Sequence, residues 1–148
     1  MDKTAAAVLA TVCAGGLIAL QAPINSTLGR TIGSLAAASV SFSIGVMALV
    51  AITLLVGGGF GDLGEARHLS WYYLLGGVLG AVYVTTSLIA VRTLGAGGVT
   101  AATIAGQLGL SLFLDRAGVL GLEERELSAG RLLGVALLAA GTFLIVRE

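Results

Sequence analysis

The longest uncharged run of this chain, residues 31–61, reads TIGSLAAASVSFSIGVMALVAITLLVGGGFG. It contains no Asp, Glu, Lys, Arg or His. A helix needs about 20 apolar residues to cross a bilayer core of roughly 30 Å, and this run is longer than that. Four further stretches reach span length, and only the last is interrupted, by Arg131: residues 4–29, 69–91, 93–114 and 127–146. The sequence therefore predicts an all-α membrane protein with five transmembrane helices.

The composition agrees with a membrane protein. Of the 148 residues, 57% are hydrophobic and 11% are charged, whereas a soluble domain carries about 25% charged residues. The net charge of zero provides no electrostatic basis for binding nucleic acid. The first uncharged run is too long for the 7–15-residue apolar core of a signal peptide, so we expect it to be retained as a membrane span.

The expected helices form a single transmembrane domain that covers residues 1–148. Pro23 lies near the expected end of the first helix, where it removes a backbone donor. Residues 62–70 form the longest polar loop, residues 95–98 form a tight turn, and Ser128 is a candidate cap for the last helix. The five helices are expected at about residues 4–28, 33–56, 71–91, 99–120 and 129–146.

Polar and small residues recur at helical spacing in four of the five expected helices. Lipid offers no hydrogen bonds, so polar groups at this depth turn toward other helices or a wet cavity. Residues spaced three or four apart share one face of a helix, and the pattern predicts an interior shared by four helices. The faces are Gln21 and Asn25; Ser34, Ser41, Gly45 and Ala48; Tyr72, Gly76, Gly80, Tyr83 and Ser87; and Thr100, Thr103, Gln107, Ser111 and Asp115.

These faces supply the candidate substrate-binding residues. The amides of Gln21, Asn25 and Gln107 need hydrogen-bond partners, which a substrate or a neighbouring helix would supply equally well. The Tyr83 ring can stack on a substrate or simply pack between helices. The full candidate set is Gln21, Asn25, Tyr83, Thr86, Thr103, Gln107 and Ser111.

Charged residues near the expected spans have two interpretations each. Asp115 is the only acid within a span-length segment, and it is the candidate for coupling transport to an ion such as a proton. The alternative is an interfacial carboxylate that is solvated or paired. Arg92 is either an interfacial anchor or a contact for an anion. No nucleophile–base pair, phosphate loop or metal-ligand spacing occurs, so no enzyme activity, cofactor or metal site is expected.

The basic residues give a weak orientation signal. Five of them, Lys3, Arg67, Arg116, Arg125 and Arg131, fall on the amino-terminal side of five expected spans, and three, Arg30, Arg92 and Arg147, fall on the other. The positive-inside rule favours a cytoplasmic amino terminus by this small excess. Such a balance is also compatible with insertion in both orientations.

Two groups of residues resemble the YdcZ family, a five-helix branch of the drug/metabolite transporter superfamily. They are Pro23-Ile24-Asn25 with Leu28-Gly29, and Gly106-Gln107 followed by Ser111, Asp115, Gly118 and Gly121. The ending, residues 132–142, resembles the last helix of the superfamily's repeat unit. The resemblance implies a multi-pass protein of the bacterial inner membrane that forms half of a ten-helix transporter.

The resemblance also implies the assembly. A short member would pair with itself as an antiparallel homodimer, or with a sister subunit, as the four-helix small multidrug resistance family does. That relative carries a glutamate in the middle of its first helix, which residues 4–28 lack, so cation antiport of that type is disfavoured.

The function expected from these features is secondary transport of a small organic metabolite or drug-like molecule, by alternating access in a dual-topology dimer within the lipid bilayer. The alternatives are a small dual-topology ion channel and a non-transporting accessory membrane subunit.

Overall fold

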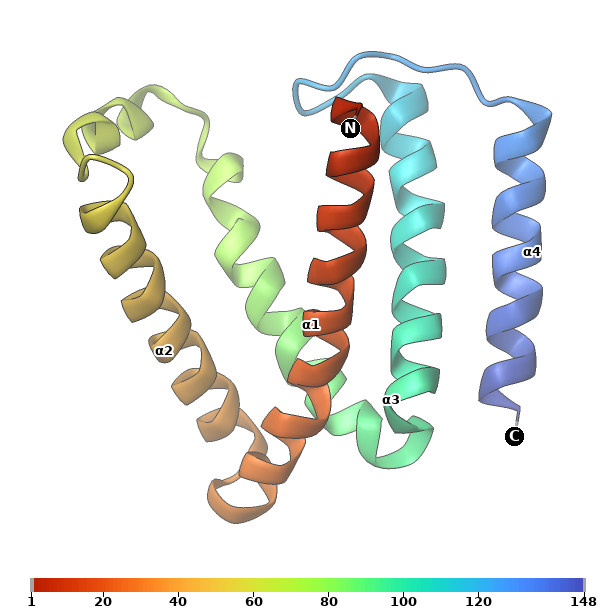
Figure 1. Ribbon diagram of the computed structural model, residues 1–148, viewed down its shortest axis with the longest axis horizontal. Helices are drawn as coiled ribbons and strands as arrows, with labels where there is room; N and C mark the ends of the chain where they lie inside the picture. Colours follow the sequence, from red (N-terminus) through yellow and green to blue (C-terminus); the bar gives the residue numbers. More distant parts are fainter. Residues whose placement is uncertain (1, 148) are drawn as a thin grey trace. The chain divides into compact units, whose positions relative to one another are not determined.

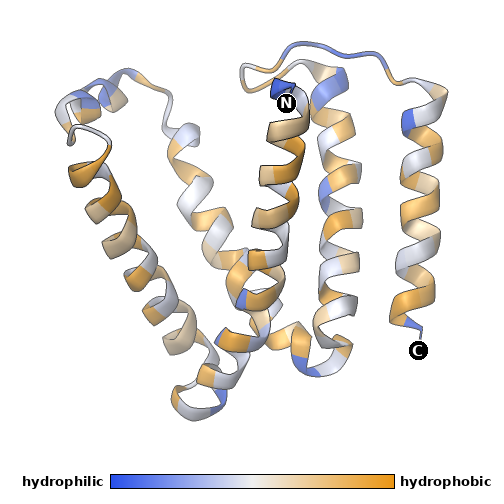
Figure 2. Ribbon diagram, viewed as in Figure 1, coloured by the Kyte–Doolittle hydropathy of each residue, from blue (hydrophilic) through white to orange (hydrophobic). Residues whose placement is uncertain are grey.

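A computed structural model describes residues 2–147, and its regular structure is entirely helical (Figure 1). The all-α class is therefore confirmed. Hydrophilic residues gather at helix ends and in connecting segments (Figure 2), as expected for helices that cross lipid. By compactness the chain divides into unit 1, up to Arg92, and unit 2, from Thr93. The elements are α1 (Lys3–Ile32), α2 (Ser34–Leu55), η1 (Gly61–His68), η2 (Trp71–Leu75), α3 (Gly76–Ala117) and α4 (Ala129–Val146).

Four segments within residues 2–147 are long and apolar enough to cross a membrane: α1, α2, Trp71–Ala117 and α4. The third is 47 residues long, about twice what one span requires, and it contains two helices that meet at a kink. Its helical conformation is interrupted at Gly95, where φ is 67° and ψ is 172°. L-residues essentially never adopt this combination. The expected turn at residues 95–98 is thus confined to Gly95, because the next three residues are already helical.

Gly95→Ala is expected to destabilise the protein by at least about 1 kcal/mol, because alanine is strained at that backbone conformation. Gly97→Ala is the matched control. Gly97 is helical and open space surrounds the position of its missing Cβ, so alanine there should be neutral or slightly stabilising. Melting temperatures of the two purified variants in detergent check the prediction. Equal melting temperatures would contradict it.

The expected end of the first helix is wrong. α1 continues past Pro23 to Ile32. Proline removes one intrahelical donor, but the later N–H groups still find their partners, and the Thr27 hydroxyl donates to the Pro23 carbonyl over 3.0 Å. The turn into α2 instead occurs at Gly33, whose φ is 90°, a value that favours glycine.

The other helix boundaries lie closer to the predicted ones. Residues expected as the polar loop and as the first turn of the third helix form the 3₁₀ helices η1 and η2. α3 ends at Ala117 and not at residue 120, because Gly118 takes a positive φ of 59°. α2 lies one residue inside its expected range at each end. α4 covers the expected residues, and the Ser128 hydroxyl accepts from the Arg131 N–H at its start.

In unit 1, α1 and α2 pack together near the turn that joins them. The buried residues of α1 are Ala22, Asn25, Ser26 and Gly29, and those of α2 are Ala37 and Ala38. Small residues on both sides let the helices approach closely. Next to this contact, Ala38 joins Val84 and Leu88 of α3 in a buried cluster, against which Phe42 and Tyr83 pack.

In unit 2, α4 contacts the part of α3 that follows Gly95. The Thr142 hydroxyl donates to the Ala101 carbonyl over 3.1 Å. Nearer the other end of α4, an ion pair joins Arg131 to Asp115. α4 has no buried residue, and these two polar contacts near its ends accompany the half-open apolar grooves that it lines together with α3.

Candidate substrate-binding site

A groove between α1 and α2 brings together two of the predicted site residues. Gln21 and Asn25 of α1 line it with Ser41 of α2, and its remaining lining is Leu, Ile and Val from both helices. The volume of the groove is about 530 Å³, within the range of small-molecule sites. Pockets of this kind combine an apolar wall with a few polar groups that orient a ligand.

The amide nitrogen of Asn25 is a buried polar atom of this groove that lacks a partner. Its side chain is 5% exposed, and its Nδ2 makes no hydrogen bond to any residue in 2–147. A buried donor left in this state costs about 1–3 kcal/mol. Nδ2 has almost no accessible surface, so an acceptor from outside the chain reaches it only if the surrounding side chains move.

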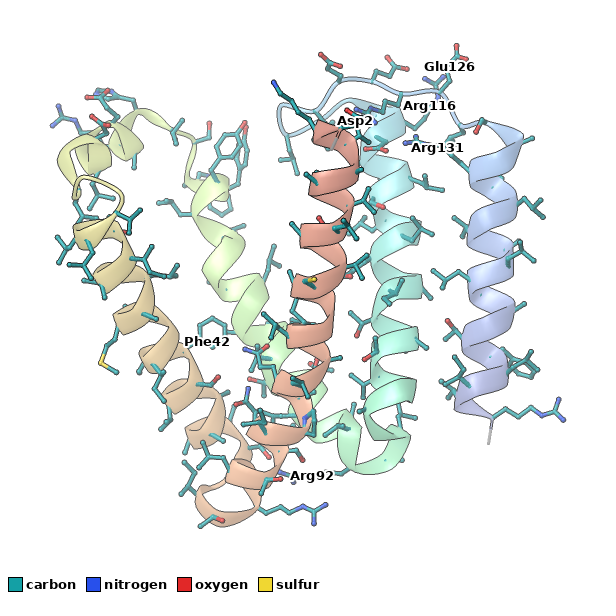
Figure 3. The ribbon with its side chains drawn as sticks, in the orientation of Figure 1. Asp2, Phe42, Arg92, Arg116, Glu126 and Arg131 are labelled. Carbon is teal, nitrogen blue, oxygen red and sulfur yellow. The ribbon has the colours of Figure 1, made fainter. Side chains whose placement is uncertain are left out.

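Arg92 of α3 lies near the turn that joins α1 to α2 (Figure 3). Its Nε donates to the Ser26 hydroxyl over 3.1 Å, and its Nη2 donates to the Ser34 hydroxyl over 3.2 Å. Gly29 makes room for the guanidinium, because a Cβ at that position would lie 3.0 Å from Nη2. Both partners of Arg92 are thus neutral acceptors on α1 and α2.

The sequence alone did not place Arg92 beside Ser26 and Ser34. A single arginine at the end of an apolar run is typical of an interfacial anchor. Its hydrogen bonds reach Ser26 and Ser34, which are 66 and 58 residues away in the chain. The one feature of the sequence that pointed to Ser26 as part of a polar region is that it directly follows Asn25 on the same helix.

Tyr83 and Thr86 do not line the α1–α2 groove. Tyr83 is half-buried and packs against the cluster of Ala38, Val84 and Leu88, which is the packing role that the sequence left open. Thr86 is exposed on the same helix. Their roles toward a substrate stay predictions.

The candidate residues of unit 2 lie on the part of α3 after Gly95. Thr103 is half-buried, and Gln107 and Ser111 are exposed. The Ser111 hydroxyl donates to the Leu108 carbonyl of its own helix over 3.0 Å. Gln107 makes no side-chain hydrogen bond within the part of the chain described. An amide in this state needs a partner from outside the chain if lipid surrounds the helix.

Asp115 is held in an ion pair in the last turn of α3. Arg131 Nη2 lies 3.1 Å from Asp115 Oδ2, and both side chains are about one third exposed or less. Arg131 Nη1 is buried and has no partner among residues 2–147. Of the two interpretations of Asp115, a paired carboxylate describes its state in this structure, and coupling stays a prediction. The sequence held a signal for this pair, since the uncharged run 93–114 ends at Asp115 and Arg131 interrupts the next apolar stretch with the opposite charge.

Breaking the Asp115–Arg131 pair should reveal an interaction between the two side chains. Asp115→Asn and Arg131→Gln should each lower the free energy of unfolding, and the double variant should lose less than the sum of the two. We expect an interaction energy of about 1 kcal/mol, because the pair is only partly buried. A double-mutant cycle of unfolding in detergent measures it, and strict additivity would contradict the prediction.

Comparison with known proteins identifies one relationship. No curated protein and no solved structure matches the chain. A protein-family model matches residues 6–144, and its description is "Putative inner membrane exporter, YdcZ".

Proposed function

The chain belongs to the YdcZ family of inner membrane exporters, and on that premise we propose that it is one half of a secondary transporter for small organic molecules. It is a multi-pass integral protein of the inner membrane. The family is one of transporters rather than enzymes. A second copy of the chain, inserted in the opposite orientation, would complete the transporter.

We infer that the chain crosses the membrane five times. The interruption at Gly95 divides the long segment Trp71–Ala117 into two parts of roughly 20 residues, each enough for one span. With α1, α2 and α4 this makes five spans. An odd number puts the two termini on opposite sides, so the two copies of an antiparallel pair would present the two halves of a pathway.

The observation that carries the proposal is the unpartnered amides on span-length helices. Asn25 Nδ2 is buried without a partner, and Gln107 is exposed halfway along its span. In lipid both amides would remain unsatisfied. A substrate or a second copy of the chain would satisfy the exposed Gln107 directly, and it would reach Asn25 Nδ2, which has almost no accessible surface, once the groove opens during transport.

The candidate residues then have defined roles. Gln21 and Asn25 would bind polar atoms of the substrate while the Leu and Ile side chains of the groove contact its apolar part. Thr103, Gln107 and Ser111 would line the pathway from α3, with Tyr83 and Thr86 as further contacts. Asp115 would couple transport by exchanging its bond to Arg131 for a proton. Rocking of the two copies would open the pathway to each side in turn.

Flux into proteoliposomes tests the function. A panel of radiolabelled carboxylates, amines, amides and sugars is offered to vesicles with and without the protein. The proposal predicts saturable uptake of at least one of these compounds. Ionic currents that rise without saturation would indicate a channel, and the absence of flux for the whole panel would contradict a transporter of small organic molecules.

A further inference from the structure

We propose that η1 lies in the lipid head-group layer of the membrane, with one row of apolar side chains turned toward the acyl chains and its acidic side chains turned toward water. The row, named the η1 ridge below, consists of Phe60, Leu63, Ala66 and Leu69. Leu63 and Ala66 lie within η1, and the other two residues flank it. The partner is the lipid bilayer, and the proposal does not depend on the transport activity proposed above.

The η1 ridge follows from the period of a 3₁₀ helix. Such a helix has about 3.0 residues per turn, so side chains three positions apart eclipse one another. The Leu63 N–H donates to the Phe60 carbonyl over 3.1 Å. The Leu69 N–H donates to the Ala66 carbonyl over the same distance. All four residues line one open hollow of about 430 Å³, so they form a continuous face.

The other two rows of η1 are polar or small. They are Asp62, Glu65 and His68, and Gly61, Gly64 and Arg67. The segment is therefore amphipathic with a period of three. An α-helix would spread the four ridge residues over about half of its circumference, and the separation from the acidic residues would be lost.

Nothing within residues 2–147 buries the η1 ridge. Phe60 is 47% exposed, Leu63 is 67% exposed and Leu69 is 57% exposed, and η1 has no buried residue. Runs of 3₁₀ helix longer than about four residues are uncommon, whereas η1 has eight. Removal of these side chains from water is favourable, so an apolar partner outside the chain would stabilise η1.

The neighbouring elements keep η1 at the membrane surface (Figure 1). The span-length helix α2 ends at Leu55, five residues before Phe60. On the other side, η2 begins at Trp71, which is 72% exposed and precedes Tyr72 and Tyr73. Trp and Tyr are enriched where spans meet the water interface. At that level an amphipathic helix inserts its apolar face by about 5–10 Å, which identifies lipid as the partner of the ridge.

The acidic row limits how deep η1 lies. Asp62 and Glu65 line the same hollow as the η1 ridge, and a carboxylate is costly to bring into hydrocarbon. These side chains therefore stay in the head-group layer or in water, and Gly64 belongs to the third row, which also stays in water. In the antiparallel pair proposed above, the η1 segments of the two copies lie at opposite membrane surfaces, so neither ridge covers the other.

Spin labels on single cysteines measure the depth of each residue. The chain has one cysteine, Cys13, so a Cys13→Ala background accepts one new cysteine at each position from 60 to 70 in turn. The full chain is placed in phosphatidylcholine nanodiscs. Collisions of the label with oxygen, which concentrates in lipid, are compared with collisions with a water-soluble nickel chelate.

We expect the oxygen-to-nickel ratio to peak at every third position, on the four residues of the η1 ridge. The period distinguishes a 3₁₀ helix, at about 3.0 residues per turn, from an α-helix at about 3.6. A ratio that peaks with the α-helical period, or that does not vary along the segment, would overturn the proposal.

Leu63 and Glu65 form the matched pair of this experiment, because both are exposed and they are two positions apart in η1. The label at Leu63→Cys should have a several-fold higher oxygen-to-nickel ratio than the label at Glu65→Cys. Rare collisions with both reagents at Leu63→Cys would mean that protein covers the ridge, and this result would exclude lipid as its partner.

A second pair of variants tests whether the apolar row holds the segment in lipid. The label is kept at Leu69→Cys, and Leu63→Asp places a carboxylate on the ridge. We expect the oxygen-to-nickel ratio at position 69 to fall several-fold, because the charged row moves toward water. Glu65→Asp keeps the charge of the acidic row and should leave the ratio unchanged. An unchanged ratio in Leu63→Asp would contradict the proposal. No flux is measured here, so this failure is distinct from failure of the proposed function.

Discussion

Leu88→Ala is expected to lower the free energy of unfolding by about 2–3 kcal/mol. Leu88 is 0% exposed, the largest fully buried side chain among the described residues. Its removal leaves a cavity in the cluster with Ala38 and Val84. Lipid tails are as apolar as leucine, so the transfer of the side chain contributes little, and the lost packing contacts account for the effect. The value is therefore at the lower end of the range for cores of soluble proteins.

The neighbouring Ile89 provides the matched control. It is 49% exposed and has the same number of carbon atoms as Leu88. Ile89→Ala should change the free energy of unfolding by less than about 1 kcal/mol, because its contacts are largely with solvent or lipid in the single chain. Chemical or thermal unfolding in detergent compares the two variants. Equal losses would show that the cluster around Leu88 does not stabilise unit 1.

The apolar stretches were sufficient to predict an all-α membrane protein, because only helices satisfy their own backbone groups in lipid. Boundaries were harder to predict where one residue decides them. Pro23 suggested a helix end, but α1 continued to Ile32 since a single missing donor does not stop it. Gly95 alone interrupts α3, whereas four small residues in succession suggested a longer turn.

The candidate site was predicted in part. Helical spacing placed Gln21 and Asn25 on one face, and the groove contains both. The hydrogen bonds of Arg92 to Ser26 and Ser34 were not predicted, since they depend on how three helices pack. Packing also gave Tyr83 its neighbours and paired Asp115 with Arg131. Periodicity within one helix carries no information about such partners, which come from elsewhere in the chain.

Gln107→Leu is expected to reduce saturable flux by tenfold or more, the loss typical of an essential polar contact worth about 1.4 kcal/mol or more. Gln107 is exposed and makes no side-chain hydrogen bond within the described chain. If a second copy or a substrate satisfies the amide, leucine removes that interaction. If lipid surrounds Gln107 instead, leucine should leave flux unchanged and stabilise the protein, because a polar group then no longer faces hydrocarbon.

The exposed Leu110 on the same helix is the control for Gln107. It is 60% exposed. Leu110→Ala should leave flux within about twofold of the parent, because substitutions of exposed side chains that make no specific contact usually have small effects. The two variants are compared in the same proteoliposome experiment, with protein content and melting temperature measured for each. A stabilised Gln107→Leu variant with full flux would contradict a pathway shared by two copies.

Labelling of one engineered cysteine tests the antiparallel pair most directly. Gly64 lies in η1, and open space surrounds its missing Cβ, so Gly64→Cys in a Cys13→Ala background offers a single reactive thiol outside the expected spans. A membrane-impermeant maleimide is applied to sealed cells and to inside-out vesicles. The account predicts labelling of comparable fractions of the protein from the two sides. Complete labelling from one side and none from the other would contradict it.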